Sequence, residues 1–211
     1  MSSAQRTGSP VQQVSETQGS KEWHEARLGN VTASRLADVF AGRQTKRRKQ
    51  YISQLAYERA GLGLWSTDDP PWFAHGRQYE HLARLTYSML VGEYVSVVGA
   101  LRGPGGLIAS PDGLVNDDGG IEIKSYKSQV EYTKATRRVP SLYVPQVMGN
   151  LYVTGRAWWD FVAYQIHTRE IAVHRVTPDP LFFDRIRREV YLINREINRK
   201  AGIKSWPLSS H

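Results

Sequence analysis

The chain contains no cysteine among its 211 residues. This absence excludes a disulfide framework, a thiolate zinc site and a cysteine nucleophile, and it fits a reducing compartment. Long apolar runs are lacking as well, since none approaches the roughly 20 residues that a membrane-spanning helix needs. The stretch MSSAQRTGSPVQQ also lacks the apolar core of a signal peptide. We therefore expect a soluble, cytoplasmic protein that does not bind membranes.

Acidic residues are fewer than basic ones: 20 Asp and Glu stand against 28 Lys and Arg, which gives a net charge of +8. The basic residues gather at 43–49, at 134–138 and along 185–200. Clustered cations among aromatic residues favour a polyanionic partner, most simply nucleic acid. For any single cluster, a solvated face that only aids solubility is the alternative.

The order of the expected elements predicts the fold class. Residues 1–19, rich in Ser, Gln, Gly and Thr, are expected to be a disordered tail, and residues 20–211 a single domain. Helices are expected from Ser20 to Leu28, from Thr32 to Phe40, at 51–60, 77–90 and 141–153, and from Pro178 to Lys200. Strands are expected at 94–98, 106–110, 112–115, 121–126, 157–166 and 170–176, and a proline-broken loop at 66–76. Helices around a strand meander, followed by helix, strand, strand and helix, predict an α/β or α+β sheet protein.

The stretch ASPDGLVNDDGGIEIKS at 109–125 places charged residues among apolar strand residues. Glu122 and Lys124 are two apart on a strand, so they share one face. Asp112 joins that face if the connecting loop has an odd number of residues, for example 117–119 with Gly119 in the left-handed conformation. In that register we expect Asp112 to lie opposite Lys124.

Two carboxylates and an ammonium group at one point suit a hard divalent cation such as Mg²⁺ with a water beside it. Pro111-Asp112, then nine residues, then Glu122-Ile123-Lys124 is the PD-(D/E)XK nuclease pattern. A structural Glu–Lys pair on a sheet surface is the alternative for the pattern alone.

Five blocks in order extend the pattern: WHEARLGNVTASRL at 23–36, HGRQYEHLARL at 75–85, SPDGLV at 110–115, IEIK at 121–124 and YVPQVMGNLYVTGRAWWDFVAY at 143–164. With these blocks the chain resembles the lambda exonuclease (YqaJ-type viral recombinase) family from about Ser20 onward. The resemblance implies a restriction-endonuclease-like PD-(D/E)XK core with a central mixed β-sheet flanked by helices. It also implies a Mg²⁺-dependent 5′-to-3′ exonuclease on double-stranded DNA ends, which releases 5′-mononucleotides and leaves a 3′ single-stranded tail. Two Mg²⁺ ions per site, with Mn²⁺ as a substitute, are part of that expectation.

The family's biology would make the protein a homotrimer ring that works with a single-strand DNA annealing protein in phage-type recombination. It would act in the cytoplasm of a bacterial host and be encoded by a phage or prophage. These expectations come from the resemblance alone.

The resemblance also implies roles for individual residues. It assigns metal binding to Asp112, Glu122 and the Ile123 backbone carbonyl, contact with the nucleophilic water to Lys124, further catalytic roles to Glu80 and Gln146, and a 5′-phosphate pocket to Arg27, Ser34 and Ser110. Without it, Glu80 is a surface partner of Arg84 four residues later, Gln146 an ordinary helix residue and Arg27 half of a helix-end salt bridge.

Three further residues are candidate DNA contacts. Arg43 is a candidate minor-groove arginine, and Trp72 or Phe73 could stack on a splayed base or be a buried core aromatic. A PD-(D/E)XK endonuclease in repair or restriction and a non-catalytic DNA-binding module stay open as alternatives. A phosphate-loop NTPase is set aside, because GALRGPGGL at 99–107 lacks the Gly-Lys-Ser/Thr ending.

Overall fold

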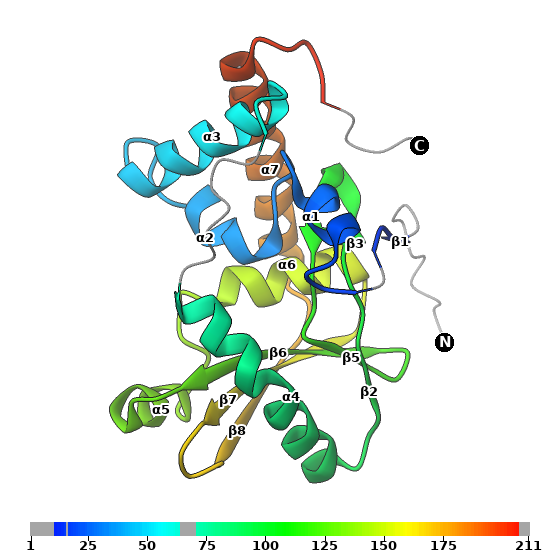
Figure 1. Cartoon of the computed structure of the whole chain (residues 1–211), viewed down its shortest axis with the longest axis vertical. Coiled ribbons are helices and arrows are strands. Elements are labelled where there is room, and N and C mark those ends of the chain that lie inside the picture. Colours follow the sequence, from blue (N-terminus) through cyan, green and yellow to red (C-terminus); the bar gives the residue numbers. More distant parts are fainter. Residues whose placement is uncertain (1–10, 16, 64–70, 207–211) are drawn as a thin grey trace.

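The structure is a computed structural model that describes residues 11–15, 17–63 and 71–206, with the backbone alone for residues 71–77. A five-stranded sheet of order β2-β5-β6-β7-β8 crosses the lower half of Figure 1, and a smaller sheet has the order β1-β3-β4. The central strands are β2 (Val95–Ser96), β5 (Gly113–Val115), β6 (Gly119–Tyr126), β7 (Trp158–Gln165) and β8 (Ile171–Val176). The small sheet contains β1 (Gln12–Gln13), β3 (Leu101–Arg102) and β4 (Ile108–Ala109).

Helices flank the central sheet on both faces (Figure 1). They are α1 (Lys21–Arg27), α2 (Leu36–Val39), α3 (Lys46–Arg59), α4 (Pro71–Val91), α5 (Gln129–Ala135), α6 (Val144–Thr154) and α7 (Pro180–Ala201), with short 3₁₀ turns η1 (Ala33–Arg35) and η2 (Pro104–Gly106). Strands β6 and β7 are parallel and the other central pairs are antiparallel. The expected α+β fold with a mixed sheet is confirmed.

Two apolar clusters fix the sheet between its helices. Ile121 and Ile123 of β6 pack with Tyr87 of α4 on one face. On the other face, Phe161 of β7 belongs to a cluster with α6, α7 and Leu36. Because neighbours on a strand alternate between faces, Glu122 and Lys124 are directed toward the α6 side of β6.

Local sequence signals explain where the main helices begin and end. The Ser20 hydroxyl accepts from the Trp23 backbone N–H at 3.1 Å and starts α1, as expected. The Asp179 side chain accepts from two backbone N–H groups in the first turn of α7, and Gly202, with φ of +71°, ends that helix in the left-handed conformation.

The β5–β6 hairpin has a different register from the expected one. Gly113 pairs with Ile121 and Val115 with Gly119, so the loop is 116–118 and Asn116, with φ of +45°, takes the left-handed conformation. Gly119 lies in the strand, and glycine is needed there because a Cβ would come within 2.0 Å of the Trp158 ring. The expected position of Asp112 opposite Lys124 is therefore wrong: the same register, continued by one residue, places Asp112 beside Glu122.

Other differences concern segments outside the hairpin. We expected residues 1–19 to be disordered, but Gln12 and Gln13 pair with β3; residues 1–10 and 16 lie outside the described residues. The expected loop at 66–76 is wrong from Pro71 onward, where α4 begins, because proline is favoured in the first turn of a helix. Helix α5 and strand β3 were not expected at all.

None of the helices in the described part of the chain is both long enough and apolar enough to cross a bilayer.

Candidate active site

Glu122 is the centre of the candidate active site. Its side chain is only 1% exposed, and three side chains donate hydrogen bonds to its two oxygens. Lys124 Nζ and Gln146 Nε2 donate to Oε1 at 2.7 and 2.6 Å, and Asn150 Nδ2 donates to Oε2 at 3.0 Å. Because both carboxylate oxygens are engaged in a buried position, the Glu–Lys pair is not an ordinary surface pair.

Asp112 lies against the same strand. Its Oδ2 accepts from the Ile123 backbone N–H at 2.6 Å, and its own backbone carbonyl accepts from Arg84 Nε at 2.8 Å. Arg84 also forms an ion pair with Glu80, one turn earlier on α4. The expected Glu80–Arg84 pair is therefore present, and it stands beside the candidate metal carboxylates.

The pKa values of Asp112 and Glu80 are both raised in this site. Burial raises the pKa of Asp112 well above its usual value, and the charges of Glu122 and Glu80 raise it further. Burial likewise raises the pKa of Glu80; Arg84 opposes this shift, and Glu122 adds to it. The three carboxyl groups thus outnumber the cations beside them, since Lys124 and Arg84 are the basic groups that offset them among the described side chains.

Lys124 is held between Glu122 and an aromatic ring. Its Nζ lies 5.1 Å from the ring centroid of Tyr143, and Tyr143 stacks on Phe161 at 5.6 Å. Burial lowers the pKa of Lys124, but the carboxylates of Glu122 and Asp112 outweigh it and leave this pKa raised. The lysine therefore stays charged in the site.

Helix α4 is anchored to the sheet by a buried polar cluster. The Tyr87 hydroxyl donates to Asp160 Oδ2 at 2.8 Å, and Arg175 donates two bonds of 2.9 Å to the same carboxylate. Tyr87 is seven residues after Glu80, so it lies on about the same side of the helix. This cluster holds the α4 face that carries Glu80 against β7.

The donor set fits a hard divalent cation. Within the described residues, no three acidic, histidine or cysteine side chains form a ready ligand group. Asp112 and Glu122 offer carboxylate oxygens, and the Ile123 carbonyl is directed to the same side of β6 as its N–H, which bonds Asp112. Two carboxylates and one carbonyl with excess negative charge suit Mg²⁺, which keeps several waters of its own.

The residues expected to hold a 5′-phosphate lie on α1, η1 and the segment after β4. Arg27 Nη1 and Trp23 Nε1 both donate to Ser110 Oγ, at 3.2 and 2.9 Å. The Arg27 guanidinium stacks on the Trp23 ring at 4.3 Å. Ser34 is exposed and its hydroxyl lies 3.2 Å from that of Thr32.

The Ser34 segment lies beside the Ser110 segment, because Thr32 forms a parallel bridge with Ile108, two residues before Ser110. The structure therefore joins Arg27 to Ser110 directly and brings Ser34 next to them through the backbone. We refer to Arg27, Ser34, Ser110 and Trp23 as the α1 pocket.

A buried clamp sets the turn that follows Arg27. Gly29, with φ of +68°, donates its N–H to Glu58 Oε2 at 2.8 Å, and its carbonyl accepts from Arg59 Nε at 2.7 Å. Arg59 also bonds the side-chain oxygens of Asn194 and Asn198 on α7 at 2.5 Å. Burial lowers the pKa of Arg59 to about 10, and the side chain is still charged at neutral pH.

The remaining expected contacts lie elsewhere. Arg43 is exposed before α3 and lines a cavity with α7 residues, away from the Glu122 cluster. Trp72 and Phe73 are in the first turn of α4, and their side chains lie outside the described residues.

Asn150, Tyr143 and Trp23 were not anticipated from the sequence. A spacing signal existed for two of them: Asn150 follows Gln146 by four residues and Trp23 precedes Arg27 by four, so each pair shares a helix face.

The fold and this cluster define a protein of the PD-(D/E)XK nuclease fold class. Residues 22–157 match the model of the YqaJ-like viral recombinase domain, and this range includes both the Glu122 cluster and the α1 pocket. The chain therefore belongs to the YqaJ-like viral recombinase domain family. No curated protein sequence matches it.

Solved structures with similar folds are consistent with this assignment. The alkaline exonuclease LHK-Exo from Laribacter hongkongensis is 32% identical, with 87% of this chain and 95% of that chain covered and a TM-score of 0.78. LHK-Exo in complex with dAMP gives the same identity and coverage and a TM-score of 0.79. A phage-related exonuclease from Haemophilus somnus 129PT is 12% identical over 81% of this chain and 94% of that one, with a TM-score of 0.68, which shows the fold alone.

Proposed function

We propose that this protein is a Mg²⁺-dependent exonuclease that degrades one strand of double-stranded DNA from its 5′ end. It would release 5′-mononucleotides and leave a 3′ single-stranded tail. The observation that carries the proposal is that Lys124 and Gln146 bond the buried Glu122 while Asp112 bonds the next residue of β6. The names of the related proteins support it, since LHK-Exo is described as an alkaline exonuclease and has been crystallised with dAMP, a 5′-mononucleotide.

The chain's own residues would divide the work of hydrolysis. Asp112, Glu122 and the Ile123 carbonyl would hold the metal, for which we expect two Mg²⁺ ions with Mn²⁺ as a substitute. When bound, the metal supplies positive charge at the scissile phosphate and lowers the pKa of a coordinated water. Lys124, which remains charged, would orient the attacking water and stabilise negative charge as it develops.

The supporting residues keep this geometry fixed. Gln146 and Asn150 orient the Glu122 carboxylate from α6, while Glu80 lies close enough to influence the charge of Asp112. A rigid carboxylate keeps the reacting atoms in position, and positioning together with charge stabilisation supplies most of the rate enhancement of such a reaction.

The α1 pocket would set the direction of degradation. Arg27 is half-buried, with Trp23 behind it and Ser110 at its guanidinium, and a guanidinium with hydroxyl groups suits a terminal phosphate. A 5′-phosphate held there would place the next phosphodiester bond at the Glu122 cluster.

The assay is digestion of a linear duplex with one labelled 5′ end, with and without Mg²⁺. We expect labelled mononucleotide to appear early and only when Mg²⁺ is present. Release of label only after the opposite end has been consumed, or equal rates in a chelator, would contradict the proposal. A covalently closed plasmid tests the endonuclease alternative, because an exonuclease leaves the circle intact.

We further propose a homotrimer ring that acts with a single-strand annealing protein in phage-type recombination, in a bacterial cytoplasm. A ring would keep the enzyme on DNA without a strong electrostatic contact, which salt would weaken.

A further inference from the structure

A basic site lies between α3 and α7, far from the Glu122 cluster. A cavity of about 290 Å³ is lined by Arg43, Arg48, Leu192, Arg195, Glu196 and Arg199; we call it the α3/α7 pocket. Figure 1 shows α3 and the last turns of α7 at the top of the molecule, whereas β6 runs through its lower half. The α7 wall lies beyond residues 22–157, so the family match assigns it no role.

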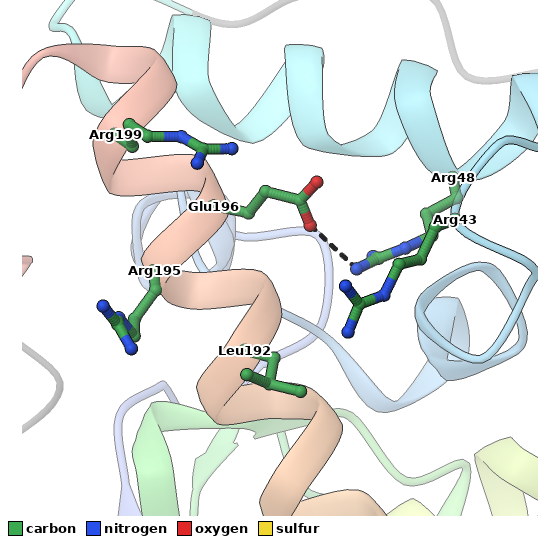
Figure 2. Close-up of a pocket in the computed structure, with 6 residues that line it drawn as sticks. All are labelled: Arg43, Arg48, Leu192, Arg195, Glu196 and Arg199. Carbon is green, nitrogen blue, oxygen red and sulfur yellow. Dashed lines mark hydrogen bonds and ion pairs between the residues drawn. The ribbon is translucent and has the colours of Figure 1, made fainter.

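The pocket carries an excess of positive charge. Four of its six lining residues are arginines, and Glu196 is the single carboxylate among them. Glu196 Oε2 accepts from Arg48 Nη2 at 2.8 Å, as Figure 2 shows. In the described part of the chain, no carboxylate forms an ion pair with Arg43 or Arg199. Guanidinium groups that line one pocket repel each other unless solvent or an anion screens their charges.

One wall of the pocket is built in a way that leaves a donor unpaired. The Arg48 side chain is only 3% exposed, and its Nη1 is buried without an acceptor among the described atoms. An unpaired buried donor is unusual in a folded protein, and it leaves the Arg48 guanidinium only partly satisfied by Glu196.

The opposite arginines are free to reach a ligand. Arg43 and Arg199 are both exposed, and Figure 2 shows them on either side of Glu196, with Arg43 beside Arg48 and Arg199 on α7. Fork-shaped guanidinium donors from α7 and from the turn before α3 match the tetrahedral oxygens of a phosphate group.

We propose that the α3/α7 pocket binds a phosphate group, and that this phosphate belongs to the backbone of duplex DNA beyond the end being degraded. The surrounding surface favours an extended polyanion over a lone ion, because exposed Lys46 and Lys49 extend the basic area along α3 and Lys200 extends it on α7. The inference rests on the proposed action on DNA. Free phosphate or a mononucleotide is the other source of the same chemistry, and the experiment separates the two.

The test measures binding to a duplex closed by hairpins at both ends, in a chelator, so that neither the α1 pocket nor hydrolysis contributes. The variant carries Arg43→Gln with Arg199→Gln. Its matched control carries Arg187→Gln with Arg188→Gln, which removes the same charge from exposed positions of α7 outside the pocket. Both are compared with the wild type over a range of salt concentrations.

We expect the slope of log affinity against log salt concentration to become shallower by about 1 in the pocket variant, which is the contribution of one phosphate contact. The control should keep a slope close to that of the wild type. A second arm measures the shift of the thermal unfolding midpoint by inorganic phosphate. If only this shift is lost in the variant, the pocket binds free phosphate and the DNA-backbone source is wrong.

A pocket variant that behaves as the control does in both arms would overturn the site. Both substituted side chains are exposed, and the single variants R43Q and R199Q give the same comparison if the double variant fails to fold. Because the closed duplex is not hydrolysed, absence of exonuclease activity on open ends would refute the proposed function without changing this result.

Discussion

At the residue scale, the surroundings of Asp112 disfavour its negative charge when no metal is bound. Burial and the charges of Glu122 and Glu80 raise its pKa, so the folded state binds protons more tightly than the unfolded state does. Asp112 therefore adds to the free energy of unfolding at low pH. This contribution is lost as the pH rises from the ordinary aspartate pKa through the raised pKa of Asp112 in the folded protein.

Asp112→Asn should consequently stabilise the protein at neutral pH in a chelator, because the amide removes the negative charge that burial, Glu122 and Glu80 disfavour. The asparagine oxygen can still accept from the Ile123 N–H. Nuclease activity should be abolished in the same variant. Thermal unfolding in EDTA and in Mg²⁺ checks this: Mg²⁺ should stabilise the wild type much more than the variant. A variant less stable than the wild type in EDTA would show that the carboxylate does not oppose folding.

Asn150 should affect metal affinity and rate by holding the Glu122 carboxylate in position. Asn150→Ala leaves Glu122 Oε2 without its donor in a buried position. Loss of such an outer contact to a metal ligand typically costs about 10- to 100-fold in metal affinity or activity. We expect the Mg²⁺ concentration for half-maximal rate to rise, with part of the rate restored by excess Mg²⁺. An unchanged Mg²⁺ dependence and rate would remove Asn150 from the site.

Arg27 should decide the preference for a phosphorylated end. Arg27→Ala should reduce the ratio of rates on 5′-phosphate and 5′-hydroxyl ends about 30-fold, because a charge-assisted hydrogen bond contributes ~2 kcal/mol. Lys21→Ala is the control, since it removes one charge from an exposed position of the same helix. A ratio that falls equally in both variants would indicate general electrostatics instead of a pocket.

At the element scale, β6 depends on two glycines that lie under tryptophan rings. A Cβ on Gly120 would come within 2.4 Å of the Trp159 ring. Gly120→Ala should therefore lower the free energy of unfolding by ~1–3 kcal/mol and displace the strand that carries Glu122. Gly42→Ala is the control, because its Cβ would meet only Thr45 at 3.7 Å. Chemical denaturation compares them, and equal stabilities would show that the rings can move aside.

The same glycines show where sequence reasoning reached its limit. Alternation on 121–124 correctly placed Glu122 and Lys124 on one face, and the Ser20 cap marks a real helix start. Gly119 was given to the turn, because glycine is the usual left-handed residue there. Only the parallel neighbour β7, distant in sequence, reveals that Trp158 needs the space.

Tertiary contacts limited the prediction of the site in the same way. The pattern identified Asp112, Glu122 and Lys124, but nothing local indicates that Arg84 bonds the Asp112 carbonyl. For Asn150, which bonds Glu122, the one local signal is its spacing of four residues from Gln146. Pro71 was taken as the middle of a loop, although a proline also suits the first turn of a helix.

At the scale of the whole molecule, the expected assembly is a closed trimer. One chain with a net charge of +8 would hold DNA by attraction that salt weakens, whereas a ring would hold it by topology. Light scattering should give three times the chain mass of 23.9 kDa. Digestion of long duplexes should continue after a heparin trap is added. A stable monomer that digests long duplexes after the trap would contradict the ring.

The clamp on Gly29 has a consequence for how the protein is made. Trp206 Nε1 donates to Asn30 Oδ1 at 3.0 Å, a contact between residues 176 positions apart, and Arg59 lies against the Trp206 ring. Asn194 and Asn198 hold the same arginine from α7. During synthesis, which proceeds from the N-terminus at about 5–20 residues per second, Arg27 emerges early and its clamp late. The turn behind Arg27 is therefore completed only after the ribosome has released α7 and Trp206, so a nascent chain carries an unfinished α1 pocket for most of its synthesis.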